Sequence, residues 1–338
     1  NRLLDVIKKE LLDIKSKYND DRRTKIVQNP GEIDIEDLIE EEASVIAMTS
    51  LNYIKRTPLD TYKSQNRGGR GIMGMQTREE DAVTRLFVCS THDYLLFFTN
   101  FGRVYRIKGY EVPEAGRTAR GLAIVNLLSI SQGETITAVV PVRDFEKDRY
   151  LVMITRSGVI KKTDMSAFAN IRKTGLTAVN LRDGDELIAA FLTDGSKNIF
   201  AATRNGMGIM FDENDVRPMG RTATGVRAIS LSEGDYVVSA DFTDKDDKLL
   251  NVTENGYGKR TDAEAYNVQH RGGKGVKIHQ ITDKTGLLSG VIKVTDNEEL
   301  MIVTSEGVII RLRGKEISIF GRVPQGVKLI NLNSGVTV

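Results

Sequence analysis

The spacing of apolar residues changes once along the chain, at about residue 45. Before that point, apolar residues follow one another at alternating intervals of three and four: Leu4, Ile7, Leu11, Ile14 and Tyr18. This is the rhythm of an amphipathic helix or of a coiled-coil strand. Two heptads do not distinguish a coiled coil from a single helix that packs on another surface. The sequence therefore predicts a helix over residues 1–20 and leaves its partner open.

Residues 21–44 lack this periodicity and are predicted to form a linker. Asn29-Pro30-Gly31 is a turn signal, and residues 31–43 hold seven acidic residues among thirteen. An acidic run of this kind is usually solvated. The alternative is that its apolar residues, such as Ile33 and Leu38, anchor it against the domain that follows.

From residue 45 onward, short apolar strands recur with a period of about fifty residues. Six segments begin with threonine and carry a turn residue three positions later; they start at Thr49, Thr99, Thr155, Thr203, Thr253 and Thr304. The turn residue is glycine in five copies and Asn52 in the first copy. A tight hairpin requires a positive φ angle, which glycine tolerates best and asparagine next. Each segment therefore predicts one hairpin of an antiparallel sheet.

A basic residue follows each threonine by eighteen positions: Arg67, Arg117, Lys173, Arg221, Arg271 and Arg322. Four residues further on, five copies have glycine, and the third copy has Thr177. A single small sheet cannot bury its own face, whereas stacked neighbours share a core and a closed ring leaves no exposed end. The sequence predicts that residues 45–338 form an all-β, six-bladed, propeller-like ring. An open solenoid of the same repeats is the alternative.

The most distinctive loop is QNRGGRG, from Gln65 to Gly71, and a near copy, QHRGGKG, covers residues 269–275. In both loops two basic side chains alternate with glycines, so that backbone amides and cations can approach the same anion. The alternative is a flexible, solvated turn. A doubled string in register with four other basic loops favours anion binding.

The distribution of charge fits a polyanion that lies along these loops. Residues 1–44 contain 8 basic and 12 acidic residues, a net charge of −4, so the rest of the chain contains 40 against 34, a net charge of +6. Duplex DNA has the regular, sequence-independent charge that equally spaced cations would contact. Aromatic residues make up only 6% of the chain, without tryptophan, which argues against stacking on single strands.

The predicted DNA-binding residues lie in these loops and are Gln65, Arg67, Gly68, Gly69, Arg70, Gly71, Arg117, Arg120, Lys173, Arg221, Arg271, Lys274 and Arg322. A second set of basic residues ends the hairpin in five of the six repeats and is expected to support the same surface: Arg56, Arg106, Lys162, Arg260 and Arg311. Met210 is the exception in this second set.

No motif for catalysis or metal binding accompanies the loops. His92, His270 and His279 are scattered and are predicted to be turn or surface residues, with His270 placed to touch phosphate. The single cysteine, Cys89, lies in the apolar run LFVCST and is predicted to be buried. One cysteine favours a reducing compartment such as the cytoplasm. No apolar run approaches the length of a membrane span.

The box QNRGGRG resembles the seven-residue box that marks the C-terminal domain of DNA gyrase A, except that Asn66 replaces a basic residue. GRTARG, GRTATGV and SAFANIR resemble other blades of that family's six-bladed β-pinwheel, and LLDIKSKYNDDRRTKI resembles the end of its coiled coil. The resemblance implies a domain that wraps duplex DNA, so that ATP-driven strand passage adds negative supercoils. It also implies that the box closes the ring against the last blade.

By the same resemblance, the catalytic tyrosine lies upstream, and ATP and Mg²⁺ belong to the whole enzyme, with gyrase B and a second copy of gyrase A as partners. This chain itself is expected to hold no cofactor, metal or active site. It begins inside a helical pattern and is expected to be a piece of a longer protein; no acidic tail follows Val338 in this sequence, so regulation by such a tail is either missing or cut away. Two alternatives remain: the equivalent domain of topoisomerase IV, and a propeller that binds proteins.

Overall fold

A computed structural model describes residues 2–20, 24, 35–61, 83–116, 118–145, 148–305 and 309–338. The chain divides into two compact units, residues 1–40 and 41–338. The first unit contains the helix α1 (Arg2–Tyr18) and the 3-10 helix η1 (Ile35–Leu38). All residues of α1 are exposed, its apolar stripe included. Among the described helices, none is long and apolar enough to cross a membrane.

The second unit is built from five four-stranded antiparallel sheets, here called blades 1 to 5, and a sixth sheet that has two strands among the described residues. In spatial order, blade 1 contains β3 (Val83–Ser90), β1 (Ala43–Thr49), β2 (Tyr53–Pro58) and β6 (Leu122–Ala123). Blade 2 contains β7 (Ile136–Val142), β4 (Tyr94–Thr99), β5 (Arg103–Lys108) and β10 (Leu176–Thr177). Blade 3 contains β11 (Leu187–Thr193), β8 (Tyr150–Thr155), β9 (Val159–Asp164) and β14 (Val226–Arg227).

The remaining sheets repeat this order. Blade 4 contains β15 (Val237–Thr243), β12 (Asn198–Thr203), β13 (Met207–Asp212) and β18 (Val276–Lys277). Blade 5 contains β19 (Leu288–Lys293), β16 (Lys248–Thr253), β17 (Tyr257–Asp262) and β22 (Val327–Lys328), and the sixth sheet pairs β20 (Glu299–Val303) with β21 (Ile309–Arg313). Short 3-10 helices follow these strands: η2 (Leu59–Thr61), η3 (Gly109–Glu111), η4 (Ile124–Asn126), η5 (Met165–Phe168), η6 (Glu213–Asp215), η7 (Ala263–Ala265) and η8 (Gly314–Glu316).

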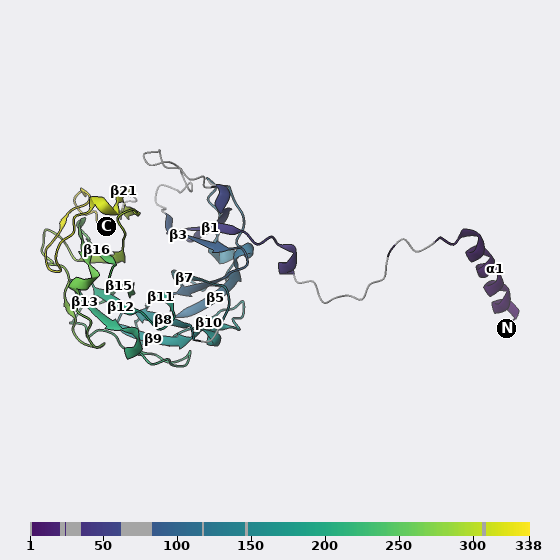
Figure 1. Ribbon diagram of the computed structural model, residues 1–338, viewed down its shortest axis with the longest axis horizontal. Coiled ribbons are helices and arrows are strands. Elements are labelled where there is room, and N and C mark those ends of the chain that lie inside the picture. The colour runs from purple at the N-terminus through teal and green to yellow at the C-terminus, as the bar shows by residue number, and fades with distance from the viewer. Residues whose placement is uncertain are drawn as a thin grey trace. The chain divides into compact units, whose positions relative to one another are not determined.

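Each of repeats 2 to 6 contributes strands to two sheets. Its hairpin forms the middle of one blade, the following loop crosses to the preceding blade, and a two-residue strand there completes that blade before the chain returns. For example, β14 follows the blade 4 hairpin but pairs with β9 of blade 3, with Val226 opposite Ile160. Neighbouring blades are therefore joined by exchanged strands as well as by packing. Figure 1 shows successive blades following one another along an arc.

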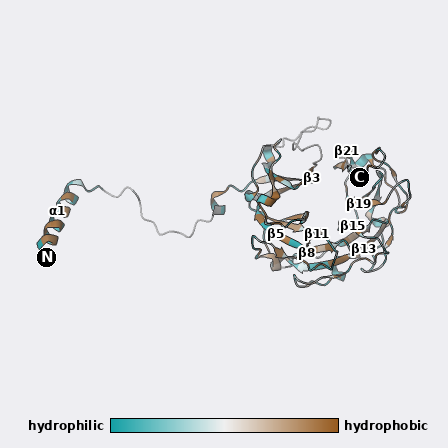
Figure 2. Cartoon of the chain, turned by 180° about the vertical axis from the view of Figure 1, so that it is seen from behind, coloured by the Kyte–Doolittle hydropathy of each residue, from teal (hydrophilic) through white to brown (hydrophobic). Residues whose placement is uncertain are grey.

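The hydrophobic core lies between blades rather than within one of them. Along β4, Leu95 and Phe97 pack with blade 1, while Leu96 and Phe98 pack with blade 3. The inner strands β7, β11, β15 and β19 also contact one another in succession. Because both faces of a central strand are buried, its sequence is a continuous apolar run rather than an alternating one. Figure 2 shows hydrophobic residues along the strands of several blades.

The predicted all-β repeat architecture is confirmed, and the strand count differs in the last repeat. Five blades have four strands each, and the sixth sheet has two within the part of the chain that the structure describes. The first strand begins at Ala43. Cys89 is buried, as predicted, and burial, with the charge of Asp93 adding to it, raises the pKa of its thiol to about 11.

Candidate nucleic-acid interface

The Thr-x-x-Gly hairpins are tight turns in which both marker residues have a structural role. The threonine hydroxyl accepts a hydrogen bond from the backbone N–H four residues later in four copies, for example Val159 N–H to Thr155 Oγ1 at 3.2 Å. The predicted positive φ is present in the five turns that the structure describes, including 60° at Asn52. The sixth turn residue, Gly307, lies outside the described residues. The hairpins therefore set a common starting point for every basic loop.

Four of the described basic loops, those of repeats 2, 4, 5 and 6, are held at both ends by the preceding blade. At its start each makes a parallel bridge to the second hairpin strand of that blade, for example Lys162 with Pro218. At its end a glycine passes close to that strand: a Cβ on Gly225 would lie 2.5 Å from the carbonyl oxygen of Ile160. No larger residue fits this approach. In the third copy, where Thr177 stands, Gly175 has the positive φ instead, at 78°.

The described loop residues differ in exposure. Gln65, Arg67, Gly68, Gly69, Arg70, Gly71 and Arg117 lie outside the described residues. Lys173 and Lys274 are exposed, whereas Arg120, Arg221, Arg271 and Arg322 are half-buried. The Arg120 guanidinium lies 4.9 Å from the centre of the Tyr53 ring. The loops of successive repeats therefore bring cations to the outer strand of one blade after another.

Arg271 stabilises its own loop as well as carrying charge. Its Nε donates to the carbonyl oxygen of Asp215 at 2.9 Å, and its Nη1 donates to that of Arg227 at 3.1 Å. The neighbouring His270 is exposed, and its Nδ1 lies 3.3 Å from the Asp215 carboxylate. In this loop Lys274 is thus the freely exposed cation, whereas Arg271 is partly committed to the backbone.

Two groups of cations in the loop region escaped the sequence-based prediction. The second residue of the outer strand is an exposed cation in three repeats: Arg227, Lys277 and Lys328. The sequence could have revealed them, because each lies twenty-four residues after the hairpin threonine of its repeat.

The second group is buried beneath the loops and consists of Lys55, Lys161 and Lys259, all at most 1% exposed. Burial lowers the pKa of each; that of Lys161 and of Lys259 falls to about 8, with nearby Arg221 and Arg322 adding to the shift. In the sequence these lysines look like ordinary polar strand residues.

The prediction that the hairpin-end cations support the DNA surface is wrong for blades 1, 3 and 5. The side chains of Arg56, Lys162 and Arg260 are only 11%, 3% and 5% exposed. Each contacts a carboxylate: Arg56 pairs with Glu42 and Glu114, Lys162 with Glu213, and Arg260 with Asp296. They belong to a central strand whose side chains face the next blade, where a charge needs a partner.

The two other members of this set differ from one another. Arg106 donates to the carbonyl oxygen of Ala169 and lies 4.9 Å from the centre of the Tyr94 ring, so it too serves the blade contact. Arg311 remains 54% exposed beside Glu299. Only Arg311 keeps the exposure that a DNA contact requires.

The prediction of a turn or surface position is also wrong for His279. It is fully buried, and neither ring nitrogen has a hydrogen-bond partner among the described residues. Burial, with the charge of Lys259 adding to it, lowers its pKa to about 4, so the ring is neutral. It occupies the core position that Ile229 and Ile330 fill in neighbouring repeats.

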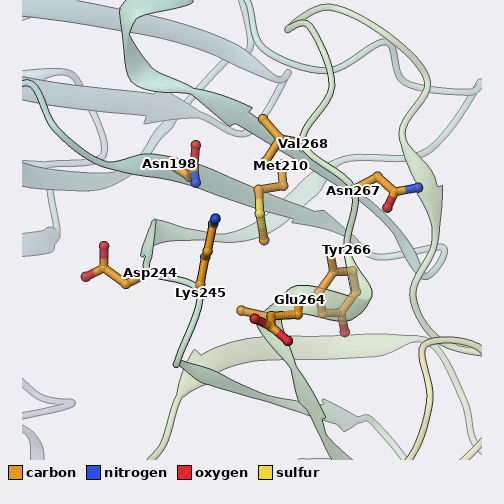
Figure 3. Close-up of a pocket in the computed structure, with 9 residues that line it drawn as sticks. Asn198, Met210, Asp244, Lys245, Glu264, Tyr266, Asn267 and Val268 are labelled. Carbon is orange, nitrogen blue, oxygen red and sulfur yellow. The ribbon is translucent and has the colours of Figure 1, made fainter.

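A pocket of about 270 Å³ lies between blades 4 and 5. Figure 3 shows Lys245 extending toward Asn198 and Met210, with Glu264 and Tyr266 on the other side. Met210 occupies the position that Lys162 has in blade 3, and Ala263 that of Glu213. The pocket thus lies where the charged pair of blade 3 is absent. Its mixed charges give it no preference for a polyanion.

Six consecutive segments of the chain match the family described as "DNA gyrase C-terminal domain, beta-propeller": residues 43–90, 93–143, 149–194, 197–244, 247–295 and 298–338. The chain belongs to this family. The six segments coincide with the six repeats seen in the sequence.

The relatives and solved structures agree with this membership. The chain is 51% identical over 333 residues to the DNA gyrase A protein of Clostridium acetobutylicum, covering 98% of this chain and 40% of that protein. It is 53% identical over 337 residues to the DNA gyrase A protein of Halalkalibacterium halodurans, covering 100% and 40%. The chain therefore spans about two fifths of the length of these relatives.

Two solved structures share the fold. The C-terminal domain of a DNA topoisomerase IV has a TM-score of 0.74 at 28% identity, covering 87% of this chain and 90% of that one. A DNA gyrase A C-terminal domain has a TM-score of 0.70 at 26% identity, covering 88% and 97%. The match to gyrase A proteins over the whole chain favours the gyrase interpretation over the topoisomerase IV alternative.

Proposed function

We propose that this chain is the DNA-wrapping domain of a gyrase, in which a duplex runs along the basic loops of successive blades. The observation that carries the proposal is that the loops of repeats 2 to 6 each cross to the outer strand of the preceding blade, which places a cation cluster on each of blades 1 to 5. A regular series of cations matches the regular phosphate charge of duplex DNA. The chain supplies no chemistry of its own in this function.

The proposed phosphate contacts combine the loop cations with those of the outer strands. In the described residues they are Arg120, Lys173, Arg221, Arg271, Lys274 and Arg322, joined by Arg227, Lys277 and Lys328. The box from Gln65 to Gly71 and Arg117 complete the set by their register in the sequence. Half-buried side chains such as Arg221 hold a defined direction, which favours a fixed path for the duplex.

The proposal extends to the whole enzyme. We expect six blades in a closed ring, with the box of the first repeat meeting the sixth sheet. We expect strand passage, ATP and Mg²⁺ to belong to a larger assembly that contains gyrase B and a second copy of gyrase A, in the cytoplasm. Residues 1–20 would then be the end of the coiled coil, and residues 21–44 the linker to the wrapping domain.

Topology measurements on DNA circles test wrapping directly. Sealing a nicked DNA circle in the presence of the chain should trap writhe in proportion to the protein bound. A domain that binds duplex without wrapping it, as expected for a degenerate topoisomerase IV-type domain, would leave the linking number unchanged. A protein-binding propeller would not bind the circle at all. Either result would overturn the wrapping proposal.

Binding of linear duplexes measures how many blades take part. If one loop per blade contacts phosphate, about six contacts release counterions and log K falls with log salt at a slope near −5. Affinity should rise with duplex length until the duplex reaches most of the blades, because bending costs roughly 1–6 kcal/mol over 20–30 base pairs and needs several contacts to offset it. A slope of −1 to −2, or a plateau at a duplex that reaches one or two blades, would contradict the proposal.

Replacement of residues 65–71 by alanine in the intact enzyme tests the box. The variant should lose negative supercoiling and retain DNA cleavage and relaxation, because the box belongs to wrapping while the cleavage chemistry lies outside this chain. Near-normal supercoiling by the variant would refute the assigned role.

A further inference from the structure

The basic loops fall into two kinds that alternate along the chain. In repeats 2, 4 and 6 the loop begins with Gly-Arg and ends with Gly: GRTARG from Gly116, GRTATG from Gly220 and GRVPQG from Gly321. In repeats 1, 3 and 5 the corresponding segments are QNRGGRG, NIRKTGL and QHRGGKG. The fifty-residue period therefore contains a two-repeat period.

The residue beneath each loop alternates in the same way. Six positions after the hairpin threonine, blades 1, 3 and 5 have a buried lysine, whereas blades 2 and 4 have Tyr105 and Ile209. Since each loop crosses to the preceding blade, the lysines of blades 1, 3 and 5 lie under the Gly-Arg loops of repeats 2, 4 and 6. The uncharged residues lie under the other kind: a Cβ on Gly175 would be 2.6 Å from the Tyr105 ring, and one on Gly273 3.8 Å from Ile209 Cδ1.

Each buried ammonium donates to main-chain carbonyl groups of the loop above it. Lys55 Nζ donates to the Gly116 carbonyl oxygen at 3.2 Å. Lys161 Nζ donates to the carbonyl oxygen of Arg221, and Lys259 Nζ to that of Gly321 at 2.7 Å and to that of Arg322. In the last two loops the acceptor belongs to the very arginine that carries the surface charge.

These contacts support the loop at a large desolvation cost. A buried ammonium loses its hydration, and within the described residues Lys161 and Lys259 contact carbonyl oxygens and no carboxylate. Tyrosine or isoleucine fills the same position in the blades between, so the fold does not require a lysine there. What the lysine adds is a charge-assisted hydrogen bond that fixes the main chain of the arginine.

We propose that Lys161 and Lys259 are positioning residues for DNA binding, each holding the loop arginine of the following repeat in the orientation that meets a phosphate, and that Lys55 supports the loop of repeat 2 in the same way through the carbonyl group of Gly116. The duplex thus contacts lysine-anchored loops on alternate blades and the other kind of loop on the blades between them. This inference rests on the proposed function, because it names the residues that organise the same surface.

The decisive variant is Lys161→Met in the 338-residue chain, compared with Arg221→Ala and with the double variant. Loss of one phosphate contact makes the salt slope shallower by about 0.9, which corresponds to about eightfold weaker binding at 0.1 M salt. Lys161→Met should weaken binding roughly threefold to eightfold. The double variant should bind within about twofold of Arg221→Ala alone. Groups that act through one another are not additive.

Val152→Ala, a core substitution in the same blade, is the control for lost stability and should leave the salt slope unchanged. Hydrogen exchange of the free protein supplies a second readout: the amide of Ala223, which donates to Gly220 at 3.0 Å, should exchange faster in Lys161→Met. If Lys161→Met does not fold, Lys259→Met with Arg322→Ala repeats the cycle in the next anchored loop.

A folded Lys161→Met that binds duplex as tightly as the unaltered chain would overturn the inference. So would additive losses in the double variant, because they would mean that the lysine acts through its charge and not through Arg221. Failure of the proposed function is a different result: the unaltered chain itself would then show no salt-dependent binding of duplex.

Discussion

The buried ion pair between Lys162 and Glu213 allows a sharp test of how the blades are joined. The two side chains are 3% and 0% exposed, and the ammonium lies 2.9 Å from the carboxylate Oε2. The other oxygen accepts hydrogen bonds from the Thr193 hydroxyl at 2.6 Å and from the Lys197 N–H at 2.7 Å. The carboxylate is therefore fully enclosed, and Lys162 is its only cationic contact in the described part of the chain.

Lys162→Met removes the cation and leaves the carboxylate of Glu213 buried without a compensating charge. Breaking a buried pair in this way costs about 3–5 kcal/mol, far more than the loss of an exposed pair. The chain itself indicates that the methionine fits, because Met210 occupies the equivalent position in blade 4, where Ala263 replaces the acid. The loss of stability should thus come from the stranded charge and not from packing.

Glu213→Gln added to Lys162→Met separates these causes. Glutamine keeps an acceptor for Thr193 and Lys197 while removing the second charge, so the double variant should recover at least about 2 kcal/mol of the free energy of unfolding lost by Lys162→Met. Equilibrium urea unfolding followed by far-UV circular dichroism measures this, provided that the m-value stays constant among the variants.

The reasoning fails if the two substitutions are additive, or if Lys162→Met alone costs less than about 1 kcal/mol. Either outcome would mean that water or a rearrangement satisfies the carboxylate of Glu213. Met210→Lys is the reciprocal control. It places an ammonium opposite Ala263 instead of a carboxylate and should be destabilising even though lysine is native at this position in blade 3.

Three further predictions concern single positions. His279 has a pKa of about 4 in the folded state, whereas in the unfolded chain it binds a proton near pH 6.5. The free energy of unfolding should therefore fall by up to roughly 3 kcal/mol as the pH drops from 6.5 to 4. His279→Ile should flatten this pH dependence in urea titrations at several pH values. Gly326→Ala should lower the melting temperature more than Gly234→Ala, because the first Cβ would lie 2.2 Å from the Gly258 carbonyl oxygen while the second has open space, at φ angles of 76° and 74°; equal shifts would show that the close approach is not limiting. Asn52→Gly should be nearly neutral and Asn52→Ala should cost about 1 kcal/mol, since the turn has a φ of 60°, and urea unfolding that ranks the two variants in the opposite order would contradict the turn assignment.

The predictions that succeeded rest on local geometry. The positive φ at Asn52 and at the hairpin glycines followed from what a tight turn demands of its residue. The recurrence of threonine, turn residue and basic loop revealed the repeat because each landmark has the same local role in every copy. The burial of Cys89 followed from the apolar run around it.

The predictions that failed depend on which neighbour a side chain faces. Arg260 and Arg311 have the same place in their repeats, yet the first is 5% exposed against Asp296 and the second is 54% exposed. His279 reads as an ordinary polar residue, but it fills a core position that isoleucine fills elsewhere. A period in the sequence cannot reveal such differences, because the deciding contacts come from another repeat.

The amino-acid sequence by itself determined the class of fold, the number of repeats and the register of the basic loops, because strand periodicity and turn chemistry act over a few neighbouring residues. Only the tertiary structure decided that the outer strand of a blade comes from the following repeat, and therefore which residues lie beneath each loop. Lys161 meets the carbonyl group of Arg221, sixty residues away, through this exchange. Whether a cation serves the surface or the core is settled by such long-range contacts, where desolvation must be offset by a partner that local sequence does not contain.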